Sequence, residues 1–178
     1  MIVPPFDGSN IVETDTMVLF WKPPACFSQW TVSLFSLGGV SYNCAEQYMM
    51  AQKAKLFNDQ ATYRLIMNAR SPSTQKRLGQ QVTNFQQATW DASADEFVYQ
   101  ANVAKFQQNP AMLGALLATG NKLLVEASPM DKIWGIGLRA DNLAAHDVSR
   151  WRGSNRLGNA LMRTRDFLKS GDGCSHTH

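Results

Sequence analysis

Short apolar runs separated by turn residues mark the first part of the chain. Met17–Trp21 is almost wholly apolar and is followed by two prolines, which is typical of a strand that ends at a turn. Residues Trp30–Phe35 alternate between apolar and polar side chains, and Gly38 and Gly39 separate them from Val40–Tyr42. A glycine pair between two segments of β type predicts a hairpin here.

From residue 45 onward, the apolar positions recur mostly at helical spacing. The spacing and the end signals predict successive helices, which cover Glu46–Lys53, Asp59–Ala69, Ser71–Leu78, Ser93–Asn109, Pro110–Gly120 and Leu157–Lys169. Leu123–Ala127 interrupts this series, because it is a short and mostly apolar stretch of strand type. The pattern as a whole predicts many helices and few strands.

The fold class that follows is α+β, a predominantly helical single domain with a small β-sheet. A length of 178 residues suits one domain with a sizeable core. We expect an irregular N-terminal segment over residues 1–15, the folded domain over 16–170 and a disordered tail over 171–178. Residues 141–153 are polar and irregular, a pattern typical of a lid or a substrate-facing loop.

Composition narrows the classes of function. The net charge of +3 and the lack of a dense basic block disfavour a domain that wraps a nucleic-acid duplex. The three cysteines have no metal-like spacing, so reduced thiols and a cytoplasmic or nuclear location fit best. We find no signal peptide and no apolar run that could span a bilayer. We therefore expect no metal, no cofactor, no membrane association and no obligate protein partner.

The helix after the predicted hairpin carries the most informative pair of side chains. Glu46 and Lys53 are seven residues apart, which places them about 20° apart around the helix and about 10 Å apart along its axis. Met50 and Phe57 lie on the same stripe. An acid and an amine on a partly apolar stripe can have shifted pKa values and carry out proton transfer or imine chemistry.

Structural roles also fit the residues of this helix. Asn43 and Glu46 have the spacing of a capping box, in which Glu46 would only stabilise the helix start. Lys53 could lay its alkyl stem along apolar neighbours and keep its ammonium in water. Tyr48 is expected to face the core.

A second group of notable residues lies towards the C-terminus. Trp134 is placed between Asp131 and a glycine-rich turn, and Asp131 could either act as an acid or cap that turn. Glu126, in an apolar strand, is either a buried, paired carboxylate or a catalytic one. Ser154 and Asn155 could cap the last helix or offer its N-terminus to a pyrophosphate.

Three sequence blocks together resemble the NADAR family of YbiA-like N-glycosidases. These blocks are Ala45–Lys53, Leu124–Gly137 and Gly153–Arg163, in this order and spacing. Phe27–Trp30 and the stretch around Trp90 fit as well, so the resemblance covers about residues 20–169. It implies a helical fold with a small β element.

The resemblance also implies an activity. The family is associated with ADP-ribose and with cleavage of N-glycosidic bonds. The implied substrates are ADP-ribosylated guanine in nucleic acid or nucleotides and, as an alternative, ribosylamino-pyrimidine intermediates of riboflavin synthesis. A non-catalytic module that binds ADP-ribose is a further alternative, although it would not need both Glu46 and Lys53.

The resemblance also indicates which residues of this chain form the site. It implies catalytic roles for Lys53, Glu46 and Asp131. Substrate contacts are expected from a larger set, namely Trp90, Trp134, Glu126, Ser28, Tyr48, Asn155 and Gly158. The chain departs from the family pattern at Gln80, where arginine is common, and at Gln29, where asparagine is usual.

Two mechanisms remain open at this point. In the first, Lys53 forms a Schiff base with the sugar and an acid protonates the ring oxygen. In the second, two carboxylates drawn from Glu46, Glu126 and Asp131 protonate the leaving base and activate water. Burial would lower the pKa of Lys53 and a close Glu46 would raise it, and the sequence does not decide between them.

Overall fold

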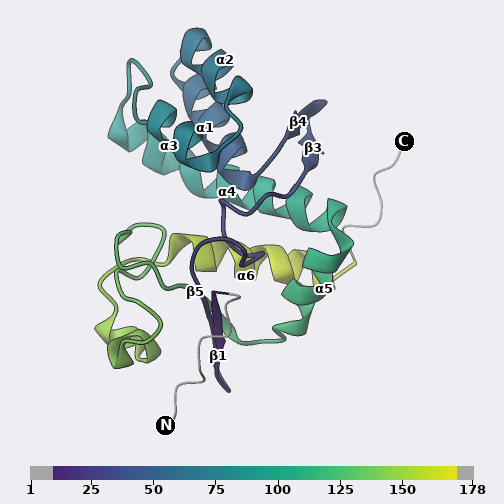
Figure 1. Ribbon diagram of the computed structural model, residues 1–178, viewed down its shortest axis with the longest axis vertical. Coiled ribbons are helices and arrows are strands. Elements are labelled where there is room, and N and C mark those ends of the chain that lie inside the picture. The colour runs from purple at the N-terminus through teal and green to yellow at the C-terminus, as the bar shows by residue number, and fades with distance from the viewer. Residues whose placement is uncertain (1–9, 172–178) are drawn as a thin grey trace. The chain divides into compact units, whose positions relative to one another are not determined.

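The computed structural model in Figure 1 describes residues 10–171 and confirms the predominantly helical α+β class. The chain divides into two compact units, one formed by the residues up to Thr31 together with those from Pro110 onward, the other by Val32–Asn109. The elements of the first unit are β1 (Ile11–Glu13), β2 (Met17–Phe20), α5 (Pro110–Ala118), β5 (Leu123–Glu126), η1 (Leu143–His146), η2 (Val148–Arg150) and α6 (Arg156–Lys169). Those of the second are β3 (Phe35–Leu37), β4 (Val40–Tyr42), α1 (Ala45–Leu56), α2 (Gln60–Asn68), α3 (Pro72–Gly79) and α4 (Gln87–Gln108).

The first unit contains a three-stranded sheet in the order β1-β2-β5. Strand β2 pairs in parallel with β5, with Phe20 opposite Glu126, and pairs antiparallel with β1. Both strands predicted from apolar runs are confirmed. Strand β1 was not predicted, because it falls in the segment expected to be irregular; it forms because Val12 is buried and a turn at Thr14 bonds to Met17. The predicted tail after Gly171 lies outside the described residues.

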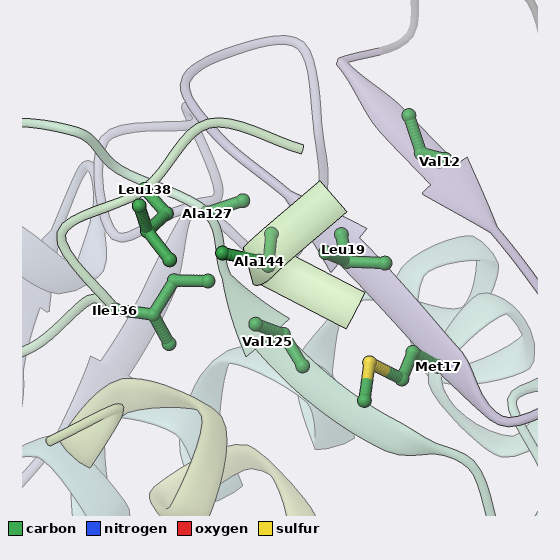
Figure 2. Packing of buried hydrophobic residues seen from close by; sticks show 9 residues of the cluster. Val12, Met17, Leu19, Val125, Ala127, Ile136, Leu138 and Ala144 are labelled. Atoms are coloured by element: carbon green, nitrogen blue, oxygen red, sulfur yellow. The ribbon is translucent and has the colours of Figure 1, made fainter. Parts of the chain in front are cut away.

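Apolar side chains from the sheet and from a long loop form the core of this unit (Figure 2). Leu19 and Val125 from neighbouring strands meet Ile136 and the two alanines of η1, Ala144 and Ala145. Residues 141–153 are therefore less irregular than their polarity predicted, while their role as a lid or a substrate-facing loop stays a prediction. Two short 3₁₀ helices run through them, and their alanines are anchored in the core.

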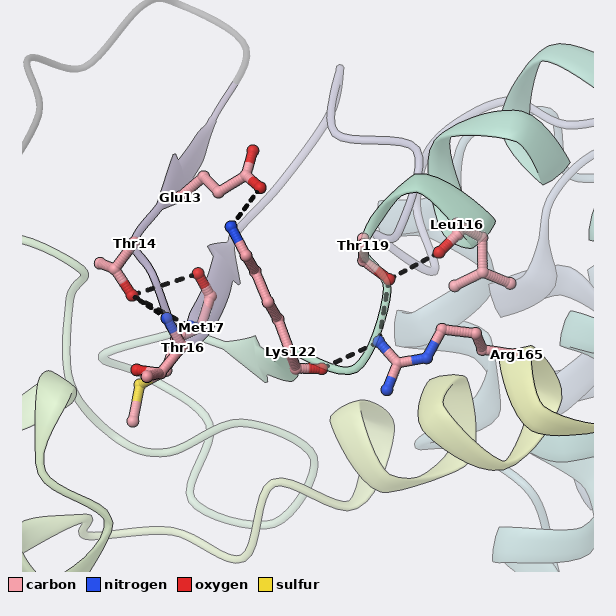
Figure 3. A network of polar contacts seen from close by, with 8 residues as sticks. All are labelled: Glu13, Thr14, Thr16, Met17, Leu116, Thr119, Lys122 and Arg165. Carbon is pink, nitrogen blue, oxygen red and sulfur yellow. Dashed lines mark hydrogen bonds and ion pairs between the residues drawn. The ribbon is translucent and has the colours of Figure 1, made fainter.

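A polar network supports the beginning of β5 (Figure 3). Lys122 forms an ion pair with Glu13 of β1 at 2.7 Å. Arg165 of α6 donates to the hydroxyl of Thr119 and to the carbonyl of Lys122, both at 2.8 Å. Arg165 is only 4% exposed, so these hydrogen bonds are buried within the unit.

In the second unit, α1 packs against α2, α3 and α4. The predicted hairpin is confirmed, with Gly38 and Gly39 at φ of +60° and +77° between β3 and β4. Its first strand begins only at Phe35, so the alternation over Trp30–Leu34 does not form a strand. These φ values favour glycine, which explains the pair.

Side-chain caps mark the starts of α2 and α3 in this unit, but not the start of α4. Asp59 caps α2 by accepting from the N–H of Thr62, and Ser71 caps α3. Helix α4 begins at Gln87, six residues before the predicted start at Ser93. The extra turns are stabilised by burial of Trp90, which packs on Phe97, rather than by a side-chain cap.

Candidate active site

The start of α1 leaves Glu46 without a capping role. Cys44 is the N-cap residue and forms no side-chain cap. The backbone N–H of Asn43 donates to Oε1 of Gln47 at 2.8 Å, and the Asn43 side chain donates to the carbonyl of Arg70. The predicted capping box is therefore wrong, because Gln47 takes the place expected for Glu46. Glu46 is nevertheless buried, with 6% of its surface exposed.

Lys53 lies two turns further along α1, between aromatic rings. Its Nζ is 4.4 Å from the centre of the Phe85 ring and 5.6 Å from the centre of the Trp90 ring. Burial lowers the pKa of the Lys53 ammonium below its ordinary value, and the charge of Glu46 offsets part of this effect. Of the two opposing effects on the pKa of Lys53, burial is therefore larger than the charge of Glu46. The ammonium of Lys53 is not fully hydrated.

Of the two rings near Lys53, one was predicted from the sequence and the other was not. Trp90, which the resemblance implied, is 7% exposed. Phe85 was missed, because it lies in the loop before α4 and belongs to no periodic pattern. Its ring meets Phe57 edge-on, with the ring centres 5.3 Å apart. Phe57 does lie on the predicted stripe with Glu46 and Lys53, so one member of this aromatic cluster was predictable from helical spacing.

Gly79, the residue before Gln80, is required by the packing of two helices. A Cβ atom on Gly79 would overlap the side chain of Met50, which is buried on α1. Gly79 thus permits close packing of α3 against α1. Gln80 is exposed and follows as the C-cap residue of α3.

Tyr48 has the core position expected for it. Its ring contacts Tyr42 edge-on, with centres 5.0 Å apart, and its hydroxyl donates to Gln100 at 3.1 Å. Burial raises the pKa of Tyr48. The substrate contact implied by the resemblance stays a prediction.

The remaining predicted site residues lie in the other unit, where Asp131 and Trp134 are close together. Oδ1 of Asp131 accepts from the N–H groups of Ile133 and Trp134 at 2.9 and 2.8 Å, so this carboxylate caps the turn. The guanidinium of Arg156 lies over the Trp134 ring, 4.6 Å from its centre. Arg156 was not singled out from the sequence. The catalytic role of Asp131 and the substrate contact of Trp134 stay predictions.

Asn155 and Gly158 join α6 to β5. Asn155 is 1% exposed, and its side chain donates to the carbonyl of Leu124 and accepts from the N–H of Glu126. A Cβ atom on Gly158 would overlap the Leu124 carbonyl and the Asn155 side chain. Asn155 precedes α6 with φ of 52° and does not cap it with its side chain. Both residues have structural roles, and their ligand contacts stay predictions.

The N–H groups that lead into α6 already have partners within the fold. The N–H groups of residues 154–157 donate in order to the carbonyls of Lys132, Gly135, Ile133 and Trp134, over 2.9–3.3 Å. An anion site at a helix N-terminus requires such groups to point at the ligand. These four groups are therefore taken up by the fold, and the hypothesis of a pyrophosphate at Ser154-Asn155 stays a prediction.

Glu126 and Ser28 complete the predicted set. Glu126 ends β5 with a half-buried side chain, and its carbonyl accepts from the N–H of Ile136. Ser28 is buried, and its hydroxyl accepts from the N–H of Trp30. Substrate contacts by both residues stay predictions.

Two further properties concern residues 10–171. Within this part of the chain, no cluster of three histidine, cysteine or acidic side chains is arranged to hold a metal ion. None of the helices described there has both the length and the apolar character needed to cross a membrane.

Comparison with known proteins identifies the family. The NADAR domain model matches residues 19–169. N-glycosidase R617 of Acanthamoeba polyphaga mimivirus is 45% identical over 166 residues, which cover 87% of this chain and 98% of that protein. Protein irg-1 of Caenorhabditis elegans is 34% identical over 171 residues, covering 87% and 81% of the two chains.

A solved structure agrees with this result. The NMR structure of Escherichia coli YbiA matches with a TM-score of 0.74 at 27% identity, over 95% of this chain and 94% of that one. The E. coli protein is named N-glycosidase YbiA. Since the family model matches most of the chain, this protein belongs to the NADAR domain family.

Proposed function

We propose that this protein is an N-glycosidase that removes ADP-ribose from guanine in modified nucleic acid or nucleotides, with Lys53 as the nucleophile. The observation that carries the proposal is the arrangement on α1. Lys53 is half-buried beneath two aromatic rings, and Glu46 is buried on the same stripe without serving as the helix cap. Relatives named N-glycosidases support the bond type.

The first step would open the sugar ring. In ADP-ribosylated guanine the sugar C1 carries an exocyclic nitrogen, whose lone pair can expel the ring oxygen and form an open-chain imine. Glu46 would donate the proton that converts this oxygen to a hydroxyl. Its buried position on the same stripe as Lys53 supports that role.

The second step would exchange one amine for another. The neutral amine of Lys53 adds to C1, and the guanine amino group leaves with a proton. A Schiff base between Lys53 and the sugar results. Water then adds to C1, Lys53 is released as the amine, and the open-chain ADP-ribose closes its ring. The lowered pKa of Lys53 supports this step, because it increases the share of neutral amine.

Aromatic rings supply the remaining part of the proposal. Trp90 faces Lys53 within the second unit. Separately, within the first unit, we propose that Trp134 stacks on a base. Stacking of a base on an aromatic side chain is typically worth about 1–3 kcal/mol. Arg156, which lies over Trp134, adds a positive charge suited to the phosphates of ADP-ribose.

Incubation with an oligonucleotide that carries ADP-ribosylated guanine tests the substrate. Mass spectrometry should show restored guanine and free ADP-ribose with the wild-type protein and with K55A, and an unchanged oligonucleotide with K53A. Lys55 is the matched control, because it is an exposed lysine on the same helix. If the wild-type protein leaves the oligonucleotide modified, this substrate is wrong, and ribosylamino-pyrimidines become the next compounds to test. Tight binding without turnover would instead favour an ADP-ribose-binding module.

A further inference from the structure

The loop between α3 and α4 brings an aromatic ring onto Lys53. Phe85 lies in this loop, and the Lys53 Nζ is 4.4 Å from the ring centre. The ring is itself supported from the edge by Phe57, at the end of α1. Phe85 is 39% exposed, so solvent reaches part of it while another part covers the amine.

A buried carboxylate fixes this loop two residues before Phe85. Oδ2 of Asp59 accepts from both the N–H and the hydroxyl of Thr83, at 2.9 and 3.1 Å. Oδ1 of the same carboxylate caps α2 through the N–H of Thr62. Hydrogen bonds from Thr83 and Thr62 lower the pKa of Asp59 to about 2, so this carboxylate remains charged near neutral pH.

The backbone turns at Asn84, between Thr83 and Phe85. Asn84 adopts φ of +57°, a left-handed conformation that asparagine tolerates better than most residues. Val82, on the other side of Thr83, is buried. The loop is thus held at Val82 and Thr83, and the turn at Asn84 then leads to Phe85.

We propose that Phe85 is a positioning residue for Lys53, and that Asp59 sets its place through Thr83. This inference rests on the proposed function, in which Lys53 is the nucleophile. The groups that face the ammonium are the Glu46 carboxylate from α1 itself, the Trp90 ring from α4 and the Phe85 ring from the loop. Of these, Phe85 alone lies on a loop, so its position depends on the hydrogen bonds from Thr83 to Asp59.

Phe85 acts on Lys53 in two opposing ways. A ring face attracts an ammonium, which favours the charged amine, whereas exclusion of water favours the neutral one. Burial is the largest effect on the pKa of Lys53, and it lowers that pKa. Loss of the ring should therefore expose the amine and raise its pKa towards the ordinary lysine value of about 10.4.

The test measures the amine directly and needs no substrate. Trace acetylation with acetic anhydride between pH 6 and pH 11, followed by mass spectrometry, gives a titration midpoint for Lys53, with Lys55 as the reference in the same molecule. We expect a higher midpoint in F85A and a smaller rise in T83V, which loses the hydroxyl donor but keeps the backbone N–H. F85Y keeps the ring and should match the wild type, as should L65A, which truncates an exposed leucine of α2.

A Lys53 midpoint that stays unchanged or falls in F85A would overturn the proposal. Thermal unfolding of each variant identifies any loss of fold, and T83V then carries the test if F85A is unstable. The result is separate from the proposed function. A wild-type protein that releases no ADP-ribose would contradict the function, while the acetylation curves would still report whether Phe85 controls the amine.

Discussion

The starts of α1 and α6 both contain polar residues, which have different roles at the two helices. Each offered a polar residue with two possible roles, a structural one at the helix start and a chemical one in the site. At α6, Asn155 uses its side chain to join β5, and the N–H groups of residues 154–157 are already bonded. At α1, Gln47 supports the helix start, and Glu46 is buried beside the stripe that carries Lys53.

This difference shows how to separate structural from chemical roles. A polar side chain that hydrogen-bonds a helix start to a strand has a structural role, because loss of those bonds would leave buried groups without partners. A buried acid on the same helix stripe as a lysine of lowered pKa is a pattern typical of a site that carries out chemistry. The helix α1 is therefore the better candidate for the chemistry.

The largest effect should come from Lys53. K53A removes the proposed nucleophile and should lower turnover of ADP-ribosylated guanine by at least about 10³-fold, since no other group replaces a covalent catalyst. Thermal unfolding should change little, because the Lys53 side chain is only half-buried. A K53A protein that retains a tenth or more of wild-type turnover would favour the two-carboxylate mechanism.

At α6, Asn155 should matter for stability. N155A leaves the Leu124 carbonyl and the Glu126 N–H without their partner, which should cost about 2–5 kcal/mol in the free energy of unfolding. Urea titration of N155A measures this loss, and N159A, at an exposed position of the same helix, is the control. Unchanged stability together with a raised KM would show that Asn155 serves the ligand instead.

Neighbouring residues of α1 should separate the two roles within one helix. Q47A removes the acceptor of the Asn43 N–H and a donor to the carbonyl of Ile66, and should cost about 1–3 kcal/mol of stability. E46Q keeps the shape of its side chain but cannot donate the proton, and should lower turnover by about 10²–10⁴-fold. Equal loss of stability in both variants, with turnover intact in E46Q, would assign Glu46 to the fold.

The smallest effect concerns acid stability. Because the folded state lowers the pKa of Asp59 to about 2, its charged form stabilises the fold above pH 4, and this contribution is lost as the pH falls from about 4 to about 2. D59N should be less stable near neutral pH and should lose less stability over that acid range. D95N, which changes an exposed carboxylate of α4, is the control for urea titrations at each pH. Parallel pH curves for D59N and the wild type would contradict this role.

Local patterns predicted much of the fold. The strands at Met17 and Leu123, the glycine hairpin and the helices that begin near Asp59 and Ser71 all follow from short-range signals, and each is confirmed. The early start of α4 was missed because burial of Trp90, rather than a cap, stabilises it. Residues 141–153 were expected to be irregular because their polarity hides two core alanines.

The candidate site was only partly visible in the sequence. Helical spacing was enough to pair Glu46 with Lys53, because both lie on one helix. Phe85 and Asp59 were missed, since their relation to Lys53 depends on how a loop returns to α1. The roles of Asn155 and Gly158 depend on contacts with β5, which sequence spacing does not encode.

Borohydride trapping tests the central claim most directly. The protein is mixed with the ADP-ribosylated guanine oligonucleotide, reduced during turnover, digested and analysed by mass spectrometry. The account predicts a reduced ADP-ribose adduct on Lys53 of α1 and none when borohydride is omitted. Restored oligonucleotide without an adduct, or an adduct on the fully buried Lys105 of α4 instead, would contradict Lys53 as the nucleophile.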